Sequence, residues 1–164
     1  VTTAILLLNA GHEATVHAIG NGVQALLAGA GPAAFLTAPA TCTEEMLRFD
    51  TPLHMFKRYA LENVEYRGIK LRRGDQIGLL LGSANRDEQK FPLPDIFNPA
   101  RSPNPHLSFG AGIHFCIGAP LARLELQTAL RVLCERLPTL QLDGKARYRD
   151  TWHFHALESL PVSW

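Results

Sequence analysis

The sequence is poor in several features that define common classes of protein. It has 164 residues but only three cysteines, and no two of them form a CxxC pair. Three scattered thiols exclude a disulfide framework and favour a reducing compartment, so we expect a cytoplasmic protein. No apolar run approaches the roughly 18 residues that a membrane span requires, and we expect no membrane association. The net charge of +1 and the lack of a basic stripe exclude a nucleic-acid partner.

What is present is a composition typical of a globular domain, with 46% hydrophobic residues. Apolar residues recur at helical spacing near both ends of the chain. Pro52 ends one predicted helix and Pro138 ends another. The helices are predicted over residues 1–28, over 33–38, from a cap at Thr41 or Thr43 to Arg48, and after Cys116. The leucines of the last helix cover more than one face, which predicts a largely buried helix.

The middle and the tail of the chain have a different pattern. Short alternating segments predict strands at residues 56–60, 64–66 and 77–81, and further short strands in 139–164. Residues 83–108 contain five prolines and few periodic apolar residues, which predicts a long ordered loop or a linker. The fold class is therefore mainly α with small β-sheets (α+β).

One ten-residue stretch, FGAGIHFCIG at 109–118, contains Cys116, one histidine and three glycines. A predicted helix follows it, and the positive end of a helix favours thiolate. A thiolate here is suited to a nucleophile, a zinc ligand or a haem ligand. Zinc requires three or four ligands, and only His114 lies at zinc spacing, while a nucleophile requires a base.

The pattern Phe-Gly-x-Gly-x-His-x-Cys-x-Gly resembles the cysteine-loop signature of cytochromes P450, with six specified positions in ten residues. Glu45-Met-Leu-Arg48 resembles the ExxR helix of that family. Phe97-Asn-Pro-Ala-Arg101 resembles its loop arginine, which completes a Glu–Arg–Arg cluster, and Arg58 matches a propionate-binding arginine. The resemblance implies the C-terminal part of the P450 fold, with residues 1–164 beginning inside the distal oxygen-binding helix and the N-terminal part absent.

The resemblance also implies a role for each matched residue. Cys116 becomes the thiolate ligand of the iron of haem b, and Phe109 shields its sulfur. Arg58 and His114 pair with the haem propionates. Glu45, Arg48 and Arg101 hold the proximal scaffold as an ion cluster. The remaining cofactor-binding positions are the glycines of the loop, Gly110, Gly112 and Gly118.

Ala10-Gly-His-Glu-Ala-Thr15 resembles the distal helix motif, in which an acid followed by an alcohol delivers protons to O2. Glu13 matches the acid, but Ala14 occupies the position where the family usually has threonine. Thr15 lies one residue further, about 100° around the helix, and does not simply replace it. Glu13 and Thr15, together with Cys116, are nevertheless the expected catalytic residues.

The function implied is a haem-thiolate monooxygenase, which inserts oxygen into a small apolar substrate using O2 and electrons from a ferredoxin or flavoprotein. Two alternatives remain open. The chain by itself is a haem-free, inactive fragment that associates with another copy or with a complementing N-terminal fragment. Alternatively, as Ala14 allows, it is a non-oxygenating haem protein such as a sensor. Arg123, Arg131 and Arg136 are expected to be solvated, or else to form part of a basic face for an acidic redox partner.

Overall fold

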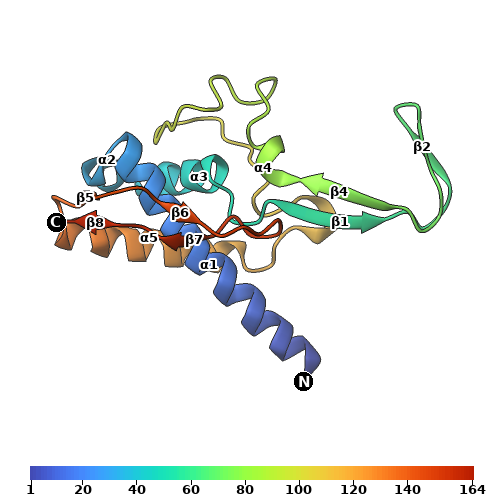
Figure 1. The fold of residues 1–164 in the computed structure, drawn as a ribbon, viewed down its shortest axis with the longest axis horizontal. Helices are drawn as coiled ribbons and strands as arrows, with labels where there is room; N and C mark the ends of the chain where they lie inside the picture. The colour runs from blue at the N-terminus through green and yellow to red at the C-terminus, as the bar shows by residue number, and fades with distance from the viewer.

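The computed structural model describes all residues, 1–164, and has a helical body from which two segments project (Figure 1). The body contains α1 (Thr2–Gly29), α2 (Pro32–Thr37), α3 (Pro39–Phe49) and α5 (Ala119–Arg136). Its core includes Leu26, Phe35, Met46 and Leu130, each at most 3% exposed. These side chains come from all four helices, so the helices pack around one common core.

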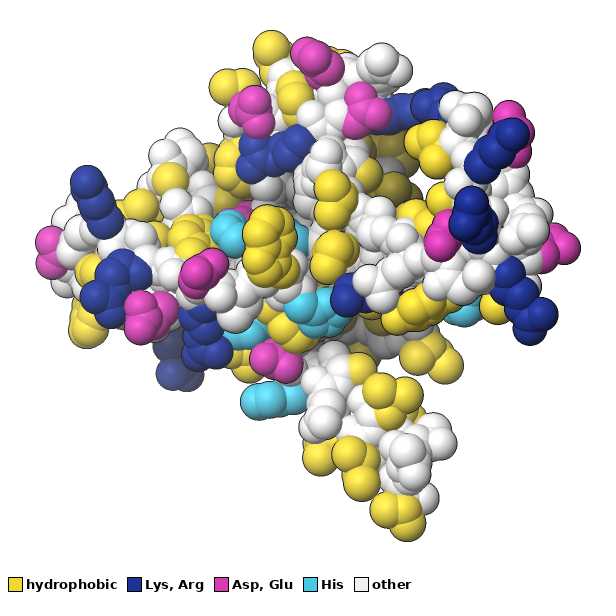
Figure 2. All heavy atoms as spheres, turned by 45° about the vertical axis from the view of Figure 1, so that its right-hand side comes forward, with side chains coloured by type: hydrophobic (Ala, Val, Ile, Leu, Met, Phe, Trp, Pro, Cys, Tyr) yellow, Lys and Arg dark blue, Asp and Glu magenta, His cyan; other side chains and the backbone are white.

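α1 runs as one helix over the predicted length, but only its second half is covered. His17, Asn21 and Leu26 are buried, whereas Ile5 and Leu8 are 54% and 73% exposed. At Gly22 an added Cβ would lie 3.1 Å from the sulfur of Met46, so glycine allows α1 to approach α3 closely. The first half projects from the body with its apolar side chains in solvent (Figure 2). None of the helices combines the length and the hydropathy of a bilayer-crossing segment.

The second projection is a β-ribbon. β1 (Met55–Tyr59) pairs antiparallel with β4 (Gln76–Leu80), and β2 (Val64–Tyr66) pairs with β3 (Ile69–Leu71) across the turn at Arg67–Gly68. The alternating sequence pattern predicted β1, β2 and β4 to within one residue, but it did not indicate β3, which is only three residues long.

The rest of the chain returns to the body. After the short α4 (Leu81–Ala84), residues 85–111 form a loop without helix or strand, which is held by internal hydrogen bonds and is therefore ordered. A 3-10 turn, η1 (Gly112–His114), precedes α5. The tail forms β5 (Gln141–Leu142) with β8 (Val162–Ser163), and β6 (Arg147–Tyr148) with β7 (Leu157–Ser159). Mainly α with small sheets is the fold class that was predicted.

Two local predictions were wrong. α3 begins at Pro39, before either predicted cap, and the Thr43 hydroxyl donates instead to the Pro39 carbonyl at 2.7 Å. α5 is not largely buried, because it packs against the body along one stripe only. Leu126 and Leu130 lie in that stripe, whereas Leu121 and Leu124 are 59% and 62% exposed.

Candidate functional site

The glycine-rich loop places Cys116 just before α5 with its side chain exposed. Gly110 and Gly112 have φ values of 71° and 65°, which favour glycine because a Cβ is strained there. The Cys116 amide donates to the Phe109 carbonyl at 2.9 Å, and the Phe115 amide donates to the Gly112 carbonyl at 3.0 Å. These two bonds fold the loop back on itself and leave the thiol on its outer side.

Cys116 differs from the other two cysteines in its surroundings. Cys42 and Cys134 are buried in the helical core. Burial raises the pKa of the Cys42 thiol to about 12, and burial raises that of Cys134 as well, so neither ionises readily. Only Cys116 is placed to bind a ligand from outside the chain.

The donor set around Cys116 fits the expected haem. A cysteine thiolate is an established iron ligand, and nothing lies within 4 Å of a Cβ built on Gly112, so a flat group can approach the loop closely. Apolar Ile113 and Ile117 beside the thiol are 97% and 89% exposed, and a large apolar cofactor would cover such surface. Arg58 is half-buried on β1, with its guanidinium donating only to the Lys57 carbonyl, at 2.9 Å. His114 is exposed on η1.

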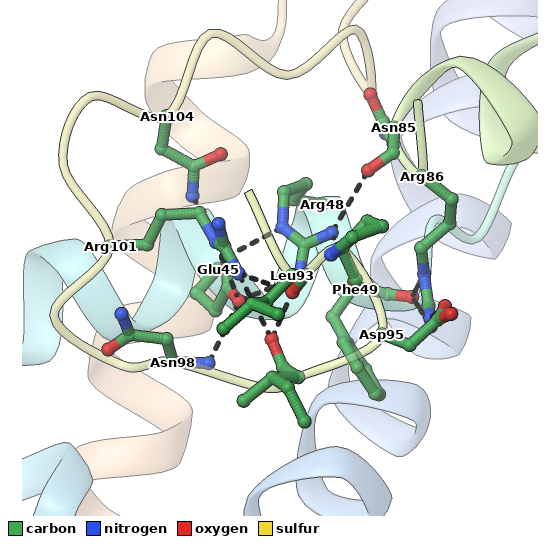
Figure 3. A network of polar contacts seen from close by, with 12 residues as sticks. Glu45, Arg48, Phe49, Asn85, Arg86, Leu93, Asp95, Asn98, Arg101 and Asn104 are labelled. Carbon is green, nitrogen blue, oxygen red and sulfur yellow. Dashed lines mark hydrogen bonds and ion pairs between the residues drawn. The ribbon is translucent and has the colours of Figure 1, made fainter. Parts of the chain in front are cut away.

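The structure brings Glu45, Arg48 and Arg101 together (Figure 3). The Arg48 guanidinium donates to both Glu45 oxygens at 2.8 Å, and Arg101 Nε lies 3.0 Å from Glu45 Oε2. Arg101 also donates to the carbonyls of Pro92, Leu93 and Ile96. The Glu45 and Arg48 side chains are fully buried, so these charges depend on one another.

A polar network beside the Glu45 cluster connects α3 to the start of the cysteine loop. The Asn85 side chain donates to the Thr51 hydroxyl at 2.6 Å and to the Ser108 hydroxyl at 2.9 Å. Its oxygen accepts from the Leu107 amide at 2.7 Å. Arg48 on α3 donates to the Asn85 carbonyl at 2.9 Å, and the Ser108 hydroxyl donates to the Leu47 carbonyl on α3 at 2.7 Å, so the long proline-rich segment is tied to α3 at both of its ends.

A second ion cluster, which no sequence motif indicated, is built on Glu44. Arg123 does not stay solvated as predicted, because its guanidinium donates to both Glu44 oxygens, at 2.7 and 2.8 Å. His106 Nε2 lies 3.0 Å from the same carboxylate. Burial alone raises the pKa of Glu44, but the hydrogen bonds from Arg123 and His106 outweigh it and lower the pKa to about 2. Arg131 and Arg136 remain exposed, as predicted.

Glu13 and Thr15 lie on different sides of α1 and do not converge. The Thr15 hydroxyl donates to the Gly11 carbonyl at 3.0 Å and to Glu125 on α5 at 3.4 Å. The Glu13 carboxylate is exposed and lies 3.8 Å from His17 Nε2. Thr15 lines a groove of about 460 Å³ between α1 and α5, whereas Glu13 lines a neighbouring hollow of about 410 Å³.

A histidine cluster at the end of α3 does not form a metal centre. Ligand atoms of Asp50, His54 and His155 lie within 4.8 Å of one another. However, the two imidazoles are stacked at 4.4 Å with only 15° between their planes. A metal must lie close to the plane of each imidazole that binds it, and two stacked planes do not meet at one ion. His155 instead bonds Asp50 at 2.7 Å and stacks on Tyr148, so the cluster ties the tail to α3.

The chain matches known proteins of one family. Residues 39–145 match the family model "Cytochrome P450". The chain is 47% identical to the biotin biosynthesis cytochrome P450 of Bacillus subtilis, over 99% of this chain and 42% of that protein. It is 42% identical to the cytochrome P450 monooxygenase PikC of Streptomyces venezuelae, over 98% of this chain and 41% of that protein.

Solved structures show the same likeness. The crystal structure of P450BioI in complex with hexadec-9Z-enoic acid ligated acyl carrier protein superposes with a TM-score of 0.90 at 47% identity. That match covers 98% of this chain and 43% of the other. The chain thus spans less than half the length of the relatives it matches. The family model covers more than half of the chain, and the backbone superposes on a P450 structure over nearly all of its length. The chain therefore belongs to the cytochrome P450 family and forms a portion of the P450 fold.

Proposed function

We propose that this chain is the cysteine-ligand part of a haem-thiolate monooxygenase. In this proposal, residues 1–164 form the C-terminal haem-binding part, and α1 belongs to the distal oxygen-binding helix. Haem b, when bound, supplies the iron that activates O2. The observation that carries the proposal is the exposed Cys116 thiol on a glycine loop, in a chain that also holds a fully buried Glu45–Arg48 pair.

The roles of the chain's own residues follow from their positions. Cys116 holds the iron, and Phe109, half-buried against the core, limits access of water to the sulfur. Arg58 and His114 are free to pair with the propionates. Glu13 is proposed to deliver protons, since its carboxylate is exposed beside a hollow. Thr15 bonds its own helix and α5, so its proposed contribution is to hold the Gly11 segment of α1 rather than to donate a proton.

The names of the relatives support an apolar acyl substrate. One relative was solved with a hexadecenoic acid ligated to acyl carrier protein. Another is the methyl-branched lipid omega-hydroxylase of Mycobacterium tuberculosis, 39% identical over 98% of this chain and 39% of that protein. We therefore propose a small apolar substrate of acyl type, with O2 and a ferredoxin or flavoprotein as electron donor.

The test of haem binding is direct. The purified chain is mixed with hemin, reduced and exposed to CO. A red-shifted, thiolate-type Soret band that disappears in Cys116→Ala supports the proposal. The matched control is Cys134→Ala, which removes a buried thiol and leaves the band unchanged. A band that is indifferent to Cys116→Ala contradicts the ligand assignment.

A second candidate is an association domain that binds no haem, and the exposed face of α1 favours it. Ile5, Leu6, Leu7 and Leu8 are each more than half exposed on one helical segment. Exposed apolar surface of this kind favours self-association or a complementing N-terminal segment. Sedimentation of the chain over a range of concentrations tests it. A monomer at all concentrations that still gives the thiolate band contradicts this candidate.

A further inference from the structure

Glu44 lies next to Glu45 on α3 but bonds a different set of partners. Its carboxylate accepts two hydrogen bonds from Arg123 on α5, at 2.7 and 2.8 Å, and bonds His106 at 3.0 Å. Arg123 comes five residues after Gly118, and His106 comes three residues before Phe109. The two partners of Glu44 therefore lie on either side of the cysteine loop, and the single carboxylate fixes both ends of the loop to α3.

The same side chains also contact the loop itself. The Arg123 guanidinium lies over the Phe109 ring, 4.5 Å from its centroid. The His106 ring is 6.1 Å from the Phe109 ring, and its Nδ1 accepts from the Ser108 amide at 3.2 Å. Phe109 provides the carbonyl that binds the Cys116 amide at 2.9 Å. A continuous chain of contacts thus runs from Glu44 through Arg123 and Phe109 to Cys116.

The Arg123–Glu44 pair is held by charge as well as by hydrogen bonds. The hydrogen bond to Glu44 raises the pKa of Arg123 against the opposing effect of burial. Arg123 is therefore a cation wherever the Glu44 carboxylate is ionised. Its bidentate geometry with Glu44 restricts the guanidinium to one orientation over Phe109.

We infer that Glu44, Arg123 and His106 are positioning residues that hold the Phe109–Gly118 loop, and through it the Cys116 sulfur, in one conformation. The inference deepens the proposed function, and the experiment below that measures haem binding rests on that function. It differs from the role of the Glu45 cluster, whose hydrogen bonds all go to α3 and to residues 85–104. Nothing in the Glu45 cluster bonds residues 109–118.

The primary test measures the loop without haem, in the whole chain of 164 residues. Amide hydrogen exchange is compared in the wild type, Glu44→Gln and Arg123→Lys, and the matched control is Arg131→Lys on the exposed face of α5. We expect exchange at Gly110 and Cys116 to rise about tenfold in both cluster variants, with little change in β1 and β4. Arg131→Lys is expected to leave all of these amides unchanged.

Two results would overturn the inference. A rise shared equally by the loop and by β1 and β4 means that the cluster only stabilises the whole fold. Unchanged exchange at Gly110 and Cys116 means that the loop does not depend on the cluster. If Glu44→Gln fails to fold, the result for Arg123→Lys tests the inference by itself. Lysine keeps the positive charge but loses the bidentate hydrogen bonds to Glu44 and the stacking on Phe109.

A second readout uses hemin, reductant and CO. The thiolate-type fraction of the Soret band is expected to fall in Glu44→Gln and to recover in Glu44→Asp, which restores the charge. An unaltered band in Glu44→Gln contradicts the inference. If the wild type itself gives no thiolate band, the proposed function fails, while the exchange experiment still decides whether the loop is positioned by Glu44.

Discussion

Glu44 and Glu45 are neighbours in the sequence, yet each organises a different region of the molecule. Successive residues of a helix point about 100° apart, so the two carboxylates meet different partners. Glu45 bonds Arg48 and Arg101, whereas Glu44 bonds Arg123 on α5 and His106 just before the cysteine loop. The Glu45 side chain is fully buried with two arginines, whereas the Glu44 side chain is 27% exposed with one arginine and one histidine. The comparison shows how one helical turn can support both the scaffold and the thiol loop.

The difference in burial determines what each cluster contributes energetically. A fully buried charge that loses its partner has no access to water, so the loss is large and affects the whole fold. A half-buried pair is partly solvated, so its net contribution is smaller and depends on the solvent. We therefore expect the Glu45 cluster to control global stability and the Glu44 cluster to control local order.

The largest effect is expected for Glu45→Gln. It leaves the buried guanidinium of Arg48 without a counter-charge and should lower the free energy of unfolding by about 3–5 kcal/mol. Urea titration followed by circular dichroism measures this change. Glu135→Gln on the exposed face of α5 is the control, with an expected change within about 0.5 kcal/mol. Equal losses in the two variants would contradict the assigned role of the buried cluster.

A smaller loss is expected for Arg101→Lys. Lysine keeps the positive charge beside Glu45 but cannot also donate hydrogen bonds to the carbonyls of Pro92, Leu93 and Ile96. The free energy of unfolding should therefore fall by about 1–3 kcal/mol. The same urea titration measures it. Protease cleavage between residues 91 and 104 should become faster than in Arg136→Lys, the exposed control. Unchanged cleavage would show that Arg101 does not order this segment.

The contribution of the Glu44 cluster to stability should depend on pH in the acid range. The pKa of Glu44 is lowered to about 2 from its usual 4.5, so its stabilisation is complete above pH 4.5 and is lost as the pH falls towards 2. The stability difference between the wild type and Glu44→Gln should shrink over that window. Unfolding midpoints measured from pH 6 to pH 2 test this. A difference that stays constant over the range contradicts the assigned pairing.

The smallest effect is expected from salt. At about 1 M NaCl the Debye length is about 3 Å, which screens half-exposed pairs more strongly than buried ones. The stability difference between the wild type and Glu44→Gln should fall by about half, since its ion pairs are accessible to solvent. The stability difference between the wild type and Glu45→Gln should not change with salt. Equal salt sensitivity of the two differences would remove the distinction between the clusters.

The sequence by itself determined the features that depend on local spacing. The six specified positions around Cys116 were sufficient to indicate the family, and apolar periodicity and proline positions located α1, α2, α5 and the end of α3. Glu45, Arg48 and Arg101 were recognised because the resemblance assigned them, and the structure places their side chains in contact. Local chemistry such as glycine conformation and proline stops is encoded within a few residues, so it can be read without the fold.

Only the tertiary structure decided which residues meet across long separations. Glu44 and Arg123 are 79 residues apart, and neither carries a local signal that distinguishes it from a solvated surface residue. The resemblance to the distal helix motif made Thr15 a catalytic candidate with Glu13, but the Thr15 hydroxyl bonds Glu125 on α5. The burial of α5 was also overestimated, because apolar periodicity shows which residues can be covered and not which partner covers them. Packing joins distant segments through three-dimensional complementarity, which no short stretch of the chain contains.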